Sequence, residues 1–218
     1  SVGEIVITGQ FNKDDAPKLL EQLFGNWKSK APYARILMPY RKVTALDRTL
    51  ETPDKQNAML IAGVLMKMSD EDPDYPAMQI ANYMLGGSTN SRLWNRIRQK
   101  EGLSYGINSS MQASSWESNA TISISAIFAP ENLERLRRGV QDEVERAQRE
   151  GFSADEVAEA KRALLQQRRL ARSQDATLAV ALTEQSFVGR TFAYSAKIDA
   201  ALESLDAPDI CFVSPPRS

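Results

Sequence analysis

The stretch LGGSTNSRLWNRIRQKEGLSYG, residues 85–106, carries the strongest local signals in this chain. Its first two glycines favour the end of one helix, and Ser88 or Asn90 can cap the start of the next. The apolar face of that second helix comprises Leu93, Trp94 and Ile97. A third glycine then precedes polar, alternating sequence, so the stretch predicts a helix that turns a corner into a strand. Arg98 and Tyr105 lie on the two sides of this corner.

Strand-like segments lie on both sides of this stretch. Residues 104–114 and 119–128 alternate apolar and polar side chains with a period of two, and the residues between them supply a hairpin turn. Shorter strands are predicted at residues 4–8, EIVIT, and 44–50, TALDRTL. Residues 57–67, NAMLIAGVLMK, form a nearly continuous apolar run, which predicts a strand at the centre of the sheet.

Helices are predicted from apolar spacing and capping residues. Besides the helix of the central stretch, the expected ranges are 15–24, 76–85, 130–149, 153–172, 175–188 and 194–204. The order β-α-β-β-α-α-β-β-α-α-α-α predicts an α+β fold, with an antiparallel or mixed sheet whose helices pack mainly on one face. We expect one domain over residues 1–206, followed by a tail, 207–218, that is disordered or derives from cloning.

The absence of histidine from the 218 residues removes many forms of catalytic chemistry. It excludes the HExxH and HxxEH zinc motifs, zinc fingers with two cysteines and two histidines, and every Ser-His-Asp or Cys-His arrangement in this chain. The lone Cys211 cannot form an internal disulfide or a thiolate zinc site. A chain that acted alone would depend on carboxylates, lysine, tyrosine, serine or threonine.

Charge and hydropathy limit the classes of binding partner and the cellular compartments that fit this chain. Lysine and arginine number 27 against 28 acidic residues, a balance that argues against a general nucleic-acid or membrane-surface binder. No apolar run approaches the roughly 20 residues of a membrane span, and the N-terminus lacks a signal-peptide pattern. Because the sequence starts directly on a strand-like segment, we expect a soluble piece of a longer protein, from a bacterial cytoplasm or periplasm.

Four other segments resemble functional motifs but fit simpler interpretations better. Residues 70–74, DEDPD, place acids like a calcium loop, yet the glycine and glutamate expected at its sixth and twelfth positions are missing. Residues 85–91, LGGSTNS, lack the ending of a phosphate-binding loop. The basic residues of 161–172 have acidic flanks and no interleaved aromatic residues, and nothing marks the carboxylates of 47–56 as an acid–base pair. We expect loops, a helix boundary and solvated surfaces at these places.

Composition and spacing alone place Arg98 as a surface charge on the last helical turn and Tyr105 as a half-buried strand residue. The central stretch, however, resembles the non-zinc domain of the insulinase-like or pitrilysin-type zinc metallopeptidases, the inverzincins. The shared pattern is a turn of small residues, an SRL helix start, a basic helix end, E-x-L-x-Y and a strand. Similar segments are ITGQFNKDDAPKLLEQLFGNW, the run 56–87 and GFSADEVAEAKRALLQQ, so the resemblance spans residues 3–205.

The resemblance implies a fold in which two similar α+β domains face each other across a cavity. One domain carries HxxEH, the zinc ion and the general base, and the other supplies an arginine and a tyrosine that reach the substrate. Those two family positions fall on Arg98 and Tyr105. The resemblance therefore implies an accessory domain that binds extended peptide and polarises the scissile carbonyl. It implies no metal ligand or other cofactor in this chain, which alone is expected to be inactive.

Because HxxEH is absent, the resemblance leaves two arrangements open: the zinc domain lies on the same longer chain, or on a separate subunit. Two alternatives to the accessory role are also open. The chain could be a catalytically silent structural homologue, such as a core subunit of a respiratory complex, which would have no zinc-bearing partner. It could also be an unrelated binding module, which would lack the two-layer α+β fold.

Overall fold

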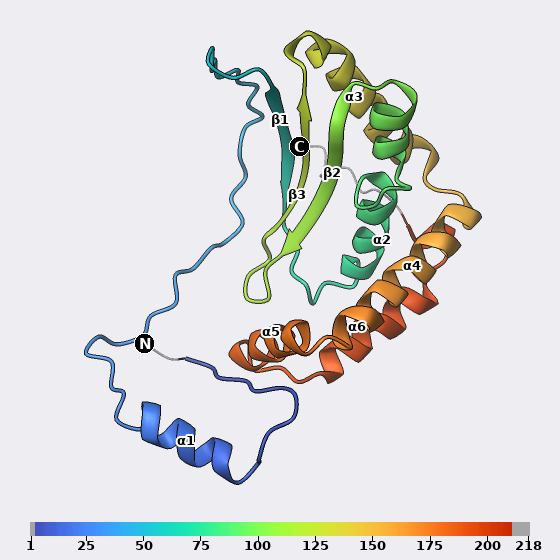
Figure 1. Ribbon diagram of the computed structural model, residues 1–218. Helices are drawn as coiled ribbons and strands as arrows, with labels where there is room; N and C mark the ends of the chain where they lie inside the picture. The colour runs from blue at the N-terminus through green and yellow to red at the C-terminus, as the bar shows by residue number, and fades with distance from the viewer. Residues whose placement is uncertain (1–2, 211–218) are drawn as a thin grey trace. The chain divides into compact units, whose positions relative to one another are not determined.

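The computed structural model describes residues 3–210 (Figure 1). The chain divides into two compact units. One unit comprises the residues up to Leu37 together with Gln166–Lys197, and the other comprises Met38–Leu165 together with the residues from Ile198 onward. The prediction of a single domain over residues 1–206 stays a prediction. The central stretch of the sequence lies in the second unit, which therefore holds the candidate site.

The second unit contains a three-stranded antiparallel sheet in the order β1-β3-β2 (Figure 1). Its strands are β1, Ala58–Met66, β2, Ser104–Ala113, and β3, Ala120–Phe128. The predicted hairpin of β2 and β3 is confirmed. The predicted central place of β1 is wrong, because β3 pairs with both neighbours and leaves β1 at an edge. An apolar run indicates burial in general, whereas the position of a strand in a sheet depends on pairing between distant segments.

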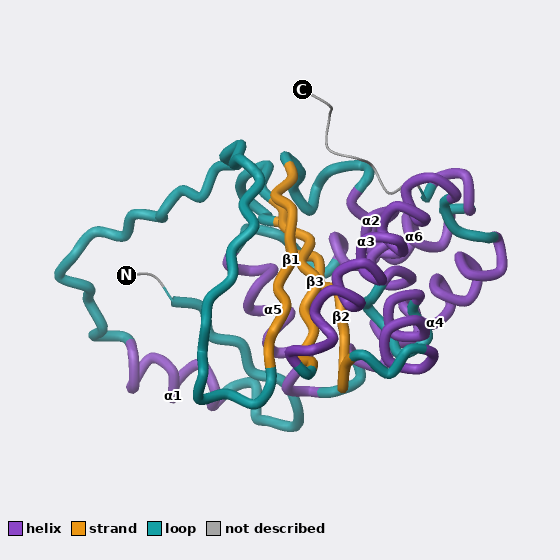
Figure 2. Tube along the Cα trace, turned by 90° about the horizontal axis from the view of Figure 1, so that it is seen from above, coloured by secondary structure: helices purple, strands orange, loops and turns teal. Residues whose placement is uncertain are grey.

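Helices cover one face of the sheet, as the sequence predicts. The covering elements are α2, Tyr75–Leu85, the π-helix η1, Trp94–Lys100, and α3, Leu133–Glu150. Both α2 and η1 contact β2, and α3 contacts α2, beside which it lies in Figure 2. The buried side chains of β3 are Ala120, Ile122, Ile124, Ala126 and Phe128. Their period of two defines the inner face of the sheet, and the intervening residues define its outer face.

The longer helices outside this layer also agree with the predicted ranges. They are α1 (Asp15–Phe24), α4 (Ala154–Arg172), α5 (Asp175–Phe187) and α6 (Ala193–Ser204). Two short 3₁₀ helices, η2 (Pro130–Asn132) and η3 (Ala207–Asp209), are also present. Helix η3 lies at the start of the predicted tail, where Asp206 caps it and Ile210 is buried. Residues 211–218, the rest of that tail, lie outside the described residues.

Two predicted strands are not formed: residues 4–8 and 44–50 have no strand conformation in the structure. An alternating pattern produces a strand only where a neighbouring strand supplies its hydrogen bonds, and neither segment has such a neighbour in the described part of the chain. The segment around residue 44 is instead held by side-chain hydrogen bonds, in which Arg137 donates to Asp47 and Asn119 donates to the carbonyl of Met38. Within the described residues, the outer edge of β1 therefore has no strand partner.

Candidate functional site

The corner between η1 and β2 is fixed by buried side chains on both of its sides. Ile97 in η1 is fully buried, and Leu103 just before β2 is 2% exposed. The amide of Leu103 donates to the carbonyl of Ile97 at 2.8 Å, which closes the turn. Gly102 lies between them with a φ of +60°, a conformation that side chains disfavour and glycine adopts freely. The predicted helix–corner–strand unit is thus confirmed, with a π-helix in place of the α-helix.

The structure brings Arg98 and Tyr105 together across this corner. The guanidinium group of Arg98 donates a hydrogen bond to the backbone carbonyl of Tyr105. It also lies 5.1 Å from the ring centroid of Trp94, within the range of a cation–π contact. The side chain of Tyr105 is 73% exposed, so it is more open than the half-buried strand residue that its pattern suggests. Among residues 3–210, Arg98 forms no ion pair, and its charge is available at the surface.

A β-bulge determines the direction of Tyr105. The register between β2 and β3 shifts between Ser104 and Gly106, which places Tyr105 at the irregular position. The buried hydroxyl of Ser104 lies 2.7 Å from the carbonyl oxygens of Gly106 and Ile127, and it accepts the amide of Gly106 at 3.1 Å. Bulges re-aim side chains, and this one leaves Tyr105 on the solvent side of β2. The role of Ser104 could not be predicted from the sequence, because no local pattern distinguishes a bulge from a regular strand.

Arg96 joins the helical side of the corner to α3. Its guanidinium nitrogens donate to Glu101 at 2.9 Å, to Asp142 at 2.7 Å and to Glu143 at 3.3 Å. The hydrogen bond to Glu101, followed by that to Asp142, raises the pKa of Arg96 against the opposing effect of its burial. Arg96 is therefore a structural cation, and its near neighbour in sequence, Arg98, is the one whose charge faces solvent. The sequence did not predict this role, since Asp142 and Glu143 lie more than 40 residues away along the chain.

A second ion pair anchors the start of the same helical stretch. Arg92 binds both carboxylate oxygens of Glu156 in α4, at 2.8 and 2.9 Å, and also donates to the carbonyl of Gly151 at 2.9 Å. Its guanidinium lies 4.4 Å from the centroid of the Phe152 ring. Hydrogen bonding to Arg92 is the largest cause that lowers the pKa of Glu156 to about 2. The bidentate geometry fixes the approach of the chain to the corner.

The weaker motifs of the sequence have structural roles. Asp70 in the acidic loop accepts a hydrogen bond from the hydroxyl of Ser115 at 2.7 Å and is 8% exposed. The basic residue Arg168 donates to Ser195, and both of these residues belong to the first unit. In the described part of the chain, no three histidine, cysteine, aspartate or glutamate side chains gather as a metal ion would require. These segments add no candidate site to the corner of Arg98 and Tyr105.

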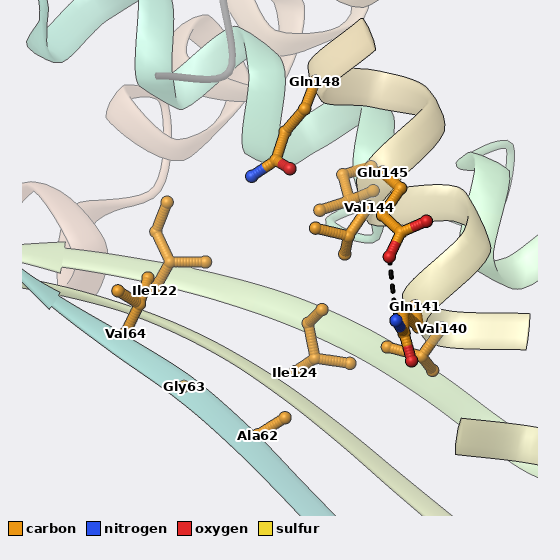
Figure 3. A pocket seen from close by; sticks show the side chains of 11 residues that line it. Ala62, Gly63, Val64, Ile122, Ile124, Val140, Gln141, Val144, Glu145 and Gln148 are labelled. Carbon is orange, nitrogen blue, oxygen red and sulfur yellow. Dashed lines mark hydrogen bonds between the residues drawn. The ribbon is translucent and has the colours of Figure 1, made fainter. Parts of the chain in front are cut away.

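A cavity of about 370 Å³ lies between α3 and the inner face of β1 and β3 (Figure 3). Its walls are mainly aliphatic, formed by Ala62, Val64, Leu85, Ile122, Ile124, Val140 and Val144. Polar groups come from Gln141, Gln148 and Glu145, whose carboxylate accepts a hydrogen bond from Gln141 at 2.8 Å. Because the cavity opens on the inner face of the sheet, it is separate from the exposed Tyr105 on the outer side. Its lining lacks paired titratable groups that could carry out acid–base chemistry.

Residues 4–164 match the sequence model of the family described as the peptidase M16 inactive domain. The chain belongs to this family. This confirms the resemblance of the central stretch to the non-zinc domain of insulinase-type zinc peptidases. Among the described residues, no helix combines the length and apolar character that crossing a membrane requires.

Three individual proteins illustrate the similarity. The uncharacterized zinc protease YmxG of Bacillus subtilis (strain 168) is 26% identical over 155 residues, which cover 71% of this chain and 35% of that protein. A protease from Helicobacter pylori matches 93% of this chain and 49% of its own, with a TM-score of 0.75 and 15% identity. A peptidase M16 inactive domain from Pseudomonas fluorescens matches 72% of this chain and 37% of its own, with a TM-score of 0.61 and 23% identity. The chain thus spans less than half of each of these proteins, and the two structural matches establish a shared fold.

Proposed function

We propose that this inactive M16 domain is one half of a composite peptidase site. It binds an extended peptide and polarises the scissile carbonyl through Arg98 and Tyr105, while a partner domain carrying HxxEH supplies the zinc ion. The observation that carries this proposal is the corner itself, where an arginine with no carboxylate partner among residues 3–210 lies beside an exposed tyrosine. Three features hold this arrangement in place: the bulge at the start of β2, the positive-φ Gly102, and the hydrogen bonds of Arg96 that fix η1.

The proposed chemistry follows from the charge that develops during peptide hydrolysis. Attack of water on a peptide carbonyl places negative charge on the carbonyl oxygen, and preorganised donors stabilise that charge. Arg98 has five N–H donors, of which the bond to Tyr105 engages one, so others can reach a substrate oxygen. The Tyr105 hydroxyl is a further donor at an exposed position. Neither group can activate water well at neutral pH, so the general base must belong to the partner.

The zinc ion would bind in the partner domain, where it would activate the attacking water and polarise the carbonyl. This chain contains no histidine, and its described residues form no metal-binding cluster. Its own contribution is then to bind and orient the peptide and to donate hydrogen bonds. This division of roles also makes the isolated chain inactive, whether the zinc domain lies on a longer chain or on a separate subunit.

Alanine at Arg98 and phenylalanine at Tyr105 test the proposal in the assembled enzyme, that is, this chain together with its HxxEH-bearing partner. We expect each substitution to lower kcat/KM by about 10- to 1000-fold, the range for removal of one oxyanion donor. Zinc content and the unfolding transition should not change, because both side chains lie at the surface.

Arg138→Ala and Tyr33→Phe are matched controls, since both residues are exposed and neither belongs to η1, the turn or β2. Their activity should equal that of the unmodified enzyme. Unchanged kcat/KM in both Arg98→Ala and Tyr105→Phe would overturn the assigned roles. Absence of zinc and activity from every assembly with an HxxEH domain would favour the silent structural homologue instead.

A further inference from the structure

We propose that the outer face of the sheet beside Tyr105 binds an apolar side chain of the peptide substrate, in a subsite formed by Met59, Ile61 and Ile127. This inference rests on the proposed function, because it extends the same site from the scissile carbonyl to the side chains of the peptide. It assigns a substrate preference to a chain that lacks the zinc machinery.

Strand register places the three side chains together. Met59 in β1 lies directly opposite Ile127 in β3, and Ile127 lies opposite Gly106 in β2, the residue after Tyr105. Ile61 follows Met59 on the same face of β1 and is a diagonal neighbour of Ile127. Opposite residues of antiparallel strands project to the same face, with Cβ atoms about 5 Å apart, and diagonal ones about 7–8 Å apart. The three side chains therefore form one patch that continues from Tyr105.

Their exposure is unusual for a sheet with a well-formed inner face. Met59, Ile61 and Ile127 are 61%, 69% and 49% exposed, whereas Ala126 and Phe128, the neighbours of Ile127 along β3, are at most 2% exposed. Isolated apolar residues on a surface need no explanation, but three on adjacent strands next to a candidate site form a contiguous patch. The core does not account for them, because they point away from it.

The charges around the patch indicate its occupant. The outer-face residues of the three described strands include no ionised side chain, and apart from Leu65 and two glycines the rest of the face carries hydroxyl and amide groups. Its polar groups satisfy one another: Ser110 and Ser123 lie 2.9 Å apart, and Ser125 donates to Asn108 at 2.6 Å. Arg98, with no carboxylate partner among the described residues, is a cation beside Tyr105 at one end of this neutral face. An extended peptide is complementary, since its carbonyl oxygens suit Arg98 and an apolar side chain suits the patch.

Sheet geometry sets where the apolar side chain lies along the peptide. Neighbouring strands lie about 4.8 Å apart, so Ile127 is about 5 Å and Met59 about 10 Å from β2. An extended peptide advances about 3.3 Å per residue, so the patch is two or three residues from the carbonyl that Tyr105 would hold. The preference is therefore expected near the scissile bond rather than at it.

Ile61→Thr and Met59→Thr test the subsite in the assembled enzyme, since threonine removes apolar surface and retains a high strand propensity. The substrates are sets of peptides identical except for leucine or serine at each of the three positions on either side of the cleaved bond. We expect kcat/KM for the preferred leucine peptide to fall about 3- to 10-fold in each variant, as partial loss of one apolar contact implies. The serine peptide should be cut at an unchanged rate, so that the selectivity ratio falls.

Leu65→Thr is the matched control, because Leu65 shares the face and strand of Met59 and Ile61 but lies at the other end, opposite Thr121. Its selectivity should equal that of the unmodified enzyme. Equal losses on leucine and serine peptides would overturn the subsite. Weaker assembly with the HxxEH partner, measured by sedimentation, would also overturn it, since the patch would then be a domain contact. If Ile61→Thr lowers the leucine-to-serine selectivity as expected, but Arg98→Ala and Tyr105→Phe leave the rate unchanged, the subsite is retained and the proposed carbonyl role is rejected.

Discussion

Two regions of the molecule have clear sequence patterns: the corner between η1 and β2, and the segment 38–56 that leads to β1. Only the corner forms the predicted structure. At the corner, Ile97 and Leu103 are buried, and Arg96 binds three carboxylates. In the segment, Leu46 is 81% and Leu50 is 77% exposed, and no ladder hydrogen bonds form. An apolar pattern forms a regular element only where a core buries its side chains and its backbone groups find hydrogen-bond partners.

The largest expected contrast comes from shortening one leucine in each region. Leu103→Ala should lower the free energy of unfolding by about 2–5 kcal/mol, because it leaves a cavity under the corner. Leu46→Ala should change it by less than about 0.5 kcal/mol, since that side chain is exposed. Urea denaturation of the two variants and the unmodified chain measures both. A large loss from Leu46→Ala would show that the segment packs as a strand in solution and would remove the contrast.

A smaller effect is expected at the glycines that flank the start of β2. Gly102→Ala should cost about 1–2 kcal/mol, because alanine disfavours the left-handed conformation at a φ of +60°. The cost is purely conformational, since an added Cβ would meet no atom within 4 Å. Gly106→Ala is the matched control: it also has open space, and its φ is not positive. Equal stabilities of the two variants would show that the corner relaxes easily and is less rigid than its contacts indicate.

The smallest predicted effect concerns how the ion pair between Arg92 and Glu156 makes the free energy of unfolding depend on pH. Arg92 and the Ser153 amide hold the pKa of Glu156 at about 2, below its ordinary value of 4.5. A carboxylate with a depressed pKa in the folded state stabilises fully above its ordinary pKa, and this stabilisation is lost as the pH falls from about 5 toward 2. Glu156→Gln should therefore flatten the decline of unfolding free energy across that range.

Arg92→Met should flatten the same decline, because it removes the main cause of the lowered pKa while leaving the carboxylate in place. Denaturation curves recorded between pH 6 and about pH 2 measure the slope for each variant. A slope identical to that of the unmodified chain in both variants would show that this ion pair does not couple proton binding to folding.

Most helices and the β2–β3 hairpin could be predicted from the sequence, because their signals are local. The apolar spacing of α3 and the alternation of β3 reflect contacts that each element makes along its whole length. The strands expected at residues 4–8 and 44–50 could not be judged this way, since a strand exists only through a partner. The edge position of β1 was mispredicted for the same reason: its apolar run resembles that of a central strand.

The sequence alone determined the family of this protein and the two residues on which its proposed chemistry depends. The absence of histidine excluded a self-contained zinc site, and the spacing of Arg98 and Tyr105 followed from a motif written in consecutive residues. These features are properties of residue identity and order, which require no knowledge of folding.

Only the tertiary structure decided which arginine is available and which way the tyrosine points. Arg96 and Arg98 are two residues apart, but carboxylates of α3 bind the first and none among the described residues binds the second. The bulge held by Ser104 directs Tyr105 outward, and cross-strand register places Ile127, and Met59 on the strand beyond it, on the same face of the sheet. Each of these facts depends on groups distant in sequence, and local patterns contain no information on such pairings.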